Sequence, residues 1–200
     1  MSTTENLEKS VGLAPLLPEY SGFVHEIFVT YPSSFRWIYT FGIPEQESLI
    51  DAVSQAATNF RIVVDVSTKR PVGVAYLYQW RPQDGVAYTD ILLIESAIDS
   101  ELFGNVAHLF MSEVFSTLNI RKLFMTVGDW QVPVIDNSLR DLLEEEGCLR
   151  EHSYFDGGWH DQLIFSISRD RFRMTKQVGK SLSRDCQARG RFQPVLEAEL

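Results

Sequence analysis

The chain has 200 residues, of which 44% are hydrophobic and 22% are charged, and its formal net charge is −9. This length and composition fit one globular domain with a substantial core and exclude a largely disordered chain. The negative charge disfavours a nucleic-acid-binding surface, because such surfaces gain affinity from Lys and Arg that neutralise phosphates.

Neither a targeting segment nor a membrane span is evident in the sequence. Residues 1–10 lack the apolar stretch of a signal peptide, and no apolar run approaches the roughly 20 residues of a membrane span. The two cysteines, Cys148 and Cys186, are far apart and have no His or Cys at metal-ligand spacing. We therefore expect a cytoplasmic protein with no disulfide, no metal and no membrane contact.

The first third of the chain predicts one strand and two helices. A short strand is expected over 11–17, a helix over 23–28 that ends before Pro32, and a second helix over 44–60 that begins at a proline followed by acids. Between the helices, aromatic residues alternate over 35–41. This stretch either lines a binding cleft for an acceptor substrate or packs beneath the helices.

A period of two then predicts three antiparallel strands. Apolar and polar residues alternate over 60–66, 72–80 and 86–94, with turns at Lys69-Arg70-Pro71 and Asp84-Gly85. The third strand becomes continuously apolar towards its end, as a buried strand does. This part of the chain is therefore predicted to be a meander.

The second half predicts a crossover followed by a final hairpin. A helix over 102–114 leads to a strand over 122–127, and a helical stripe over 135–143 is expected to end at Gly147. The last two strands are predicted over 149–155 and 162–168. Within this reading, Glu144, Glu145 and Glu146 form a solvated helix face, and Cys148 is a small buried hydrophobe.

Three segments carry a family signature near the end of the predicted domain. These are Gly147-Cys148-Leu149-Arg150-Glu151-His152, then Phe155-Asp156-Gly157-Gly158-Trp159-His160-Asp161, then Leu163 to Arg169. Residues 115–123 match as well. In this signature and in element order, the chain resembles the GCN5-related N-acetyltransferase (GNAT) superfamily and its RimJ/RimL-like branch.

The resemblance implies an α/β fold, with a mixed central sheet of about six to seven strands flanked by about four helices. The GNAT-like domain is expected over residues 11–173. Residues 1–10 are expected to be a flexible N-terminus, and residues 174–200 a C-terminal tail, because the apolar pattern fades beyond Phe172. In such a fold, the third meander strand and the strand after the next helix separate, and the pantetheine arm of acetyl-CoA or another acyl-CoA lies between them. The backbone of Ile91, Leu92 and Leu93 is expected to pair with that arm.

The loop expected to hold the cofactor phosphates departs from the family pattern. Between Ile94 and Val106 the glycine-rich, basic motif is reduced to Gly104, followed by Asn105. Glu95, Asp99 and Glu101 place carboxylates where phosphates would lie, which opposes binding. The same acids also suit an ordinary helix start with no ligand.

A second landmark is an Asn at the next helix start, followed later by a Tyr that protonates the leaving thiolate. Here Asp136 stands at the Asn position, and Asn137 substitutes for it if the loop shifts by one residue. Leu143 stands at the Tyr position and cannot donate a proton.

Candidate catalytic groups lie on the third meander strand. Tyr88 and Asp90 share one face by the period-two rule, and Asp90 is the predicted general base for an amine. The alternative reading is a solvated acid near a strand start. His152, which shares a strand face with Tyr154, is a further candidate for orienting an amine or relaying a proton. The other histidines, His25, His108 and His160, show no partner in the sequence.

Two functions follow from the resemblance. The first is an N-acyltransferase that moves an acyl group from acyl-CoA, or from an acyl carrier protein, to a primary amine of a peptide, a protein or a small metabolite. The second is a catalytically inactive binding or assembly module that has lost CoA binding. The protein is expected to be a monomer or a homodimer.

Overall fold

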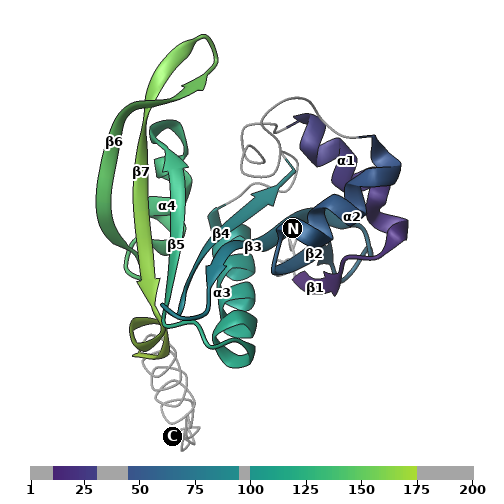
Figure 1. Cartoon of the computed structure of the whole chain (residues 1–200), viewed down its shortest axis with the longest axis horizontal. Helices are drawn as coiled ribbons and strands as arrows, with labels where there is room; N and C mark the ends of the chain where they lie inside the picture. The colour runs from purple at the N-terminus through teal and green to yellow at the C-terminus, as the bar shows by residue number, and fades with distance from the viewer. Residues whose placement is uncertain (1–10, 31–44, 95–99, 175–200) are drawn as a thin grey trace, which may run out of the picture.

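Seven strands of the computed structural model form one mixed sheet in the order β1-β2-β3-β4-β5-β7-β6 (Figure 1). The structure describes residues 11–30, 45–94 and 100–174. The strands are β1 (Val11–Pro15), β2 (Asn59–Asp65), β3 (Pro71–Arg81), β4 (Val86–Leu93), β5 (Lys122–Gly128), β6 (Glu144–Phe155) and β7 (Gly158–Ser168). The helices are η1 (Pro18–Tyr20), α1 (Ser21–Thr30), α2 (Gln46–Ala56), α3 (Ser100–Thr117), η4 (Asp129–Gln131) and α4 (Val132–Leu139).

Helices cover both faces of this sheet and create two apolar clusters. Helices α1 and α2 pack on one face, where Val24, Phe28 and Leu49 are buried with Tyr76 of β3. Helices α3 and α4 pack on the other face, where Phe110 is buried with side chains of β3, β4, β5 and β7. Successive side chains of a strand point to opposite faces, so the alternating pattern of the sequence feeds both clusters.

The predicted architecture is confirmed by this arrangement. Within the described residues there are seven strands and four α-helices, and the meander β2-β3-β4 is antiparallel as expected. The crossover from β4 through α3 to β5 makes a parallel pair, as a connection through a helix allows. The predictions for residues 1–10, for the aromatic stretch 35–41 and for almost all of the tail 174–200 fall outside the described residues.

The boundary between α4 and β6 differs from the prediction. Helix α4 ends at Leu139 and a turn carries Leu142 and Leu143 onto the core, so Gly147 lies within β6 and is not a helix cap. The apolar spacing of the predicted helix continued through this turn, which is why the sequence pattern placed the end of the helix too late.

The three consecutive glutamates were therefore misassigned. They begin β6, and Glu146 forms an ion pair with Lys122 of β5 and accepts a hydrogen bond from the Ser166 hydroxyl of β7 at 2.5 Å. These bonds hold the pKa of Glu146 below its usual range. Cys148, predicted as buried, is exposed on the same strand.

Among the described residues, no helix is both long and apolar enough to cross a membrane.

Candidate functional site

The parallel strands β4 and β5 separate after only three residue pairs. They pair at Val86–Lys122, Ala87–Leu123 and Tyr88–Phe124. Beyond Tyr88, β4 remains paired with β3 as far as Leu93, while β5 remains paired with β7 as far as Gly128. We call the point beyond the Tyr88–Phe124 pair the fork. Figure 1 shows the two halves of the sheet diverging from it.

An aromatic row crosses the sheet at the fork, on the face covered by α1 and α2. The ring of Tyr88 lies 5.4 Å from Phe124 and 5.6 Å from Tyr78, and Tyr78 lies 6.0 Å from Tyr76. A further stacked contact joins Tyr76 to Phe60 at 5.4 Å. Tyr88 thus lies where it was predicted, on the same face as the residues that surround Asp90.

Asp90 is held by two hydrogen bonds just beyond the fork. The Tyr76 hydroxyl donates to its Oδ2 at 3.1 Å, and the backbone N–H of Ile91 donates to its Oδ1 at 2.9 Å. Burial raises the pKa of Asp90 to about 6, and these two bonds limit the rise by stabilising the charged form. The carboxyl group is therefore partly buried and hydrogen-bonded and is not the solvated acid that the alternative reading describes.

Tyr78 reaches from β3 across β4 to β5. Its side chain is 8% exposed, its ring is tilted against Tyr88, and it forms a hydrogen bond with the side chain of Thr126. Burial and then the nearby negative charge of Asp90 raise the pKa of Tyr78 far above its usual value, and the Thr126 bond opposes that rise. A neutral phenol thus lies at the fork.

Beyond the fork, no described strand pairs with β4 on the side that faces β5. Residues Ile91, Leu92 and Leu93 pair with β3 on one side, and β5 gives them no partner on the other. Their side chains are all at most 8% exposed, which fixes the strand in place. An extended chain entering the fork would meet this edge, as the prediction for these three residues requires.

The predicted phosphate-binding residues are placed less favourably. Gly104 and Asn105 lie in the second turn of α3, so neither belongs to the first turn, where a helix offers its N–H groups to an anion. Glu101 lies exposed in the first turn, where it suits the helix dipole and repels an anion. The remaining acids of the predicted loop, Glu95 and Asp99, fall outside the described residues.

Asn137, the predicted substitute for the family Asn, belongs to α4, which follows β5 and η4 along the chain. Leu143, which stands where the resemblance expects Tyr, is buried in the core beside α3.

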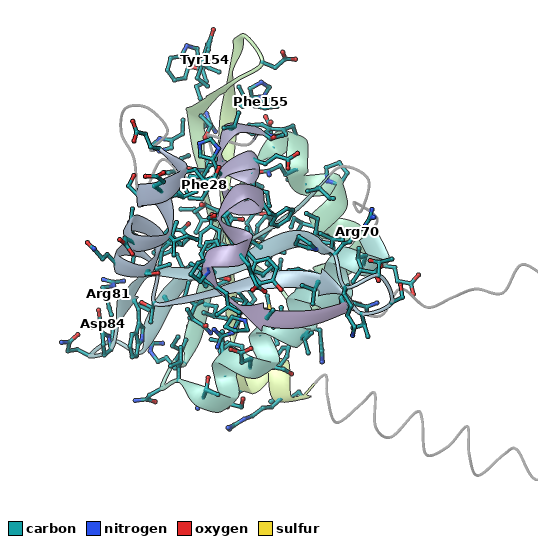
Figure 2. All side chains as sticks on the ribbon, turned by 90° about the vertical axis from the view of Figure 1, so that its right-hand side faces the viewer. Phe28, Arg70, Arg81, Asp84, Tyr154 and Phe155 are labelled. Carbon is teal, nitrogen blue, oxygen red and sulfur yellow. The ribbon has the colours of Figure 1, made fainter. Side chains whose placement is uncertain are left out.

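His152 lies far from the fork in the sheet order. It is exposed on β6, where the pairing with β7 is irregular between Leu149 and Ser153. Strand β6 is three positions from β4, which corresponds to roughly 14 Å at about 4.8 Å per strand. Tyr154 lies at the tip of this hairpin (Figure 2). The geometry brings Tyr88 and Asp90 together and leaves His152 apart.

Two groups were missed by the sequence reasoning. Tyr78 could have been found, because it shares a strand face with Tyr76 and stands opposite Tyr88 on the neighbouring strand of the predicted meander. The second group, His160, donates a hydrogen bond from Nδ1 to the Asp129 carboxylate at 3.0 Å, and its ring meets Trp130 edge-on. These partners are 30 or more residues apart, so local spacing carries no sign of them. No cluster of metal-ligating side chains occurs in the described part of the chain.

Comparison with solved structures relates this fold to N-acetyltransferases. A mutant form of the spermidine/spermine N-acetyltransferase SpeG from Vibrio cholerae matches with a TM-score of 0.70 at 16% identity, over 83% of this chain and 98% of that one. The spermidine N-acetyltransferase from Vibrio cholerae in complex with CoA and spermine gives 0.68 at 16% identity, over 81% and 97%.

A third similar structure is RimL, the ribosomal L7/L12 α-N-protein acetyltransferase, in complex with coenzyme A. It gives a TM-score of 0.66 at 15% identity, over 82% of this chain and 97% of that one. No family model and no curated protein sequence matches this chain. At such low identity the likeness establishes the fold, so the predicted GNAT fold is confirmed.

Proposed function

We propose that this chain is an N-acyltransferase that transfers an acyl group from acyl-CoA to a primary amine. The observation that carries the proposal is the fork, which places a partly buried carboxylate beside an edge of β4 that no described strand pairs with. Three solved structures with the same fold are N-acetyltransferases, and two of these contain CoA.

The residues at the fork and at the start of α3 fit the pantetheine arm of an acyl-CoA better than its phosphates. The free edge of β4 suits the extended, amide-bearing pantetheine arm, whereas Glu101 at the start of α3 does not suit the phosphates. We therefore expect weak CoA binding that depends mainly on the arm. An acyl carrier protein is a second donor to test, because its surface can supply binding that the phosphates do not.

The proposed reaction is direct attack of the amine on the thioester that the donor supplies. Asp90 takes a proton from the amine, the nitrogen forms a bond with the carbonyl carbon, and the carbon–sulfur bond then breaks. The pKa of Asp90, about 6, leaves the carboxylate ionised at neutral pH yet more basic than an exposed aspartate. The leaving thiolate takes the proton from Asp90 or from solvent, so the products are the amide and the thiol form of the donor.

Replacing the base tests this mechanism. Asp90→Asn keeps an acceptor oxygen near the Ile91 N–H but cannot take a proton, so kcat is expected to fall by roughly 10²- to 10⁴-fold. In the wild type, kcat/KM should fall below pH 6, and that limb should be absent from the residual activity of the variant. Asp84→Asn, in the exposed β3–β4 turn (Figure 2), is the matched control and should leave both quantities unchanged.

A panel of donors and acceptors tests the proposal as a whole. Isothermal titration with acetyl-CoA, longer acyl-CoAs and an acyl carrier protein measures donor binding. Spermidine, a peptide with a free N-terminus and a simple alkylamine then serve as acceptors, because similar structures act on spermidine and on a ribosomal protein. If no donor binds at high micromolar concentration, the inactive binding module of the second hypothesis replaces this proposal.

Our further proposals for this enzyme are a RimJ/RimL-like acceptor range, a cytoplasmic location and a monomeric or homodimeric state. Fractionation of expressing cells and light scattering on the purified protein test the last two.

A further inference from the structure

We propose that Tyr76 positions the base of the reaction: its hydroxyl fixes the orientation of the Asp90 carboxylate and holds that carboxylate in the charged form that accepts a proton. This inference rests on the proposed function and gives a role to a residue outside the predicted set. Tyr76 acts through Asp90, so it is a positioning residue and does not itself contact the reacting atoms.

The first step is the direct pairing of the two residues across β3 and β4. Tyr76 and Asp90 are Cα partners in this antiparallel pair, so their side chains leave the sheet on the same face. The Tyr76 hydroxyl donates to Oδ2 of Asp90 at 3.1 Å, and the backbone N–H of Ile91 donates to Oδ1 at 2.9 Å. With one donor on each oxygen, the plane of the carboxylate is fixed.

The second step is the rigidity of the donor. The Tyr76 side chain is fully buried, and its ring stacks on Phe60 with centroids 5.4 Å apart and lies 6.0 Å from Tyr78. The backbone is held as well, because the Thr89 hydroxyl donates to the Tyr76 carbonyl oxygen at 3.2 Å. A packed ring has little room for another rotamer, so the hydroxyl is aimed at Asp90 before any substrate arrives.

The third step is the capacity that remains on the carboxylate. An ionised carboxylate has about four acceptor positions on its two oxygens. Within the described residues, Tyr76 and Ile91 occupy two of these positions on Asp90. The carboxylate can therefore still accept the proton of the amine. Tyr76 keeps its own proton and donates to Asp90 throughout, so the atoms and charges of the proposed reaction balance without it.

The fourth step is the charge state of the base at neutral pH. Burial raises the pKa of Asp90 to about 6, and the Tyr76 bond, followed by the Ile91 bond, opposes that rise. A hydrogen bond to a charged group corresponds to about one to two pH units. Without the Tyr76 bond, Asp90 would therefore be largely protonated at neutral pH and unable to take a proton. Burial makes Asp90 a stronger base, and Tyr76 keeps that base ionised.

Asp90 has several titratable neighbours that a pH experiment must separate from it. Tyr78 and Tyr88 lie on the same face of the sheet, and a phenol is uncharged near pH 6. Lys122 lies against Phe124 on β5 and forms an ion pair with a glutamate of β6. The remaining titratable side chains of η1, α1 and α2 are exposed or half-buried: Glu19, Tyr20, His25, Glu26, Glu47 and Asp51. Asp90→Asn retains all of these groups, so an acid limb that this variant loses belongs to Asp90.

The test is the pH dependence of kcat/KM for Tyr76→Phe, which removes only the hydroxyl. The ratio of variant to wild type cancels the titration of the acceptor amine. We expect the acid limb to move from about pH 6 to about pH 7–8, with kcat/KM about three- to twentyfold below wild type at pH 6.5 and within about threefold of it at pH 9. Tyr154→Phe makes the same chemical change on the exposed hairpin and should leave the limb and kcat/KM unchanged.

A double variant tests whether Tyr76 acts through the base. In the Asp90→Asn background, Tyr76→Phe should change kcat/KM at pH 6.5 by less than about twofold, because no carboxylate is left to orient or to ionise. A merely structural role would lower kcat/KM by the same factor in both backgrounds and would leave the limb near pH 6. Either of these results, in a folded Tyr76→Phe variant of an active enzyme, overturns this inference alone.

A measurement on the wild type applies if Tyr76→Phe does not fold. In protein labelled with ¹³C at the tyrosine Cζ carbons, the NMR signal of Tyr76 is assigned through the ring contact with Phe60. This signal should shift with a midpoint near pH 6 in the wild type and should not do so in Asp90→Asn. A Tyr76 signal that does not titrate overturns the inference. A folded wild type that neither binds nor uses any donor overturns the proposed function, and this role with it.

Discussion

The buried carboxylate of Asp90 makes a pH-dependent contribution to folding. Its pKa is about 6 in the folded chain and 3.8 in an exposed setting, so the folded state holds the proton more tightly. The folded state is therefore favoured while Asp90 is protonated, and this stabilisation is lost as the pH rises from about 4 to 6. A raised pKa thus costs stability at the neutral pH at which Asp90 is proposed to act as a base.

Asp90→Asn should relieve that cost. We expect the variant to exceed the wild type in free energy of unfolding by about 2–3 kcal/mol at pH 7.5 and by little at pH 4. Urea denaturation at the two pH values measures the difference. Equal differences at both pH values would contradict the assignment of the raised pKa to this carboxyl.

Gly128 at the end of β5 is required because an aromatic ring lies against its backbone. A Cβ at this position would stand 2.2 Å from the Trp130 ring, which stacks on Phe155 with centroids 4.4 Å apart. The ring of His160 on β7 meets the same indole edge-on at 5.0 Å. The glycine therefore permits a contact between the β5 end and the long hairpin.

Gly128→Ala should displace this indole. The expected loss is about 1–3 kcal/mol of stability, as for other overpacked sites, together with a shift in tryptophan emission. Gly147→Ala is the matched control, because a Cβ there meets nothing within 4 Å. A loss of the same size in both variants would mean that the Trp130 contact is not the cause.

At the scale of elements, Arg169 links the end of β7 to α3 and to the segment between α3 and β5. Its guanidinium donates to the carbonyl oxygens of Ile120 at 2.7 Å and Leu118 at 2.6 Å, and it lies over the Phe115 ring. These carbonyls belong to the segment between α3 and β5. The last residue of the sequence signature thus connects the segment between α3 and β5 to the end of β7.

Arg169→Leu should loosen this junction. Two carbonyl oxygens lose a charged donor, so we expect a loss of about 2–4 kcal/mol, measured as a lower urea midpoint. The control is Arg173→Leu, since Arg173 is exposed. The idea fails if the two variants have the same midpoint.

At the scale of the whole molecule, the net charge of −9 opposes a polyanionic donor. Glu101, in the first turn of α3, also repels the donor phosphates locally, and Asp99 stands two residues before it in the sequence. Acyl-CoA affinity should therefore improve with salt, because screening weakens the repulsion between like charges.

The double variant Asp99→Asn, Glu101→Gln tests this effect. We expect its Kd for acetyl-CoA to be about three- to tenfold lower than that of the wild type in low salt, with the gap closing at high salt. Isothermal titration at two ionic strengths gives both numbers. Replacing Glu19 and Glu26 of η1 and α1 removes the same charge elsewhere and should change Kd little. An equal gain in both double variants would assign the effect to net charge alone.

The sequence by itself determined the meander, the crossover and the position of Asp90 beside Tyr88. Those features depend on local alternation and on turn residues, and both can be read within a few residues of chain. The sequence pattern placed the end of α4 too late, because Leu142 and Leu143 keep helical spacing in a turn. It also assigned Glu146 to a helix, because the partners of this side chain lie on the distant strands β5 and β7.

Only the tertiary structure decided what surrounds the base. The separation of β4 from β5, the burial that raises the pKa of Asp90, and the hydrogen bond from Tyr76 to Asp90 all join residues from different strands. Periodicity tells which face a side chain occupies, but the twist and divergence of the sheet set which side chains meet across it. The chemistry proposed for this chain depends on those meetings.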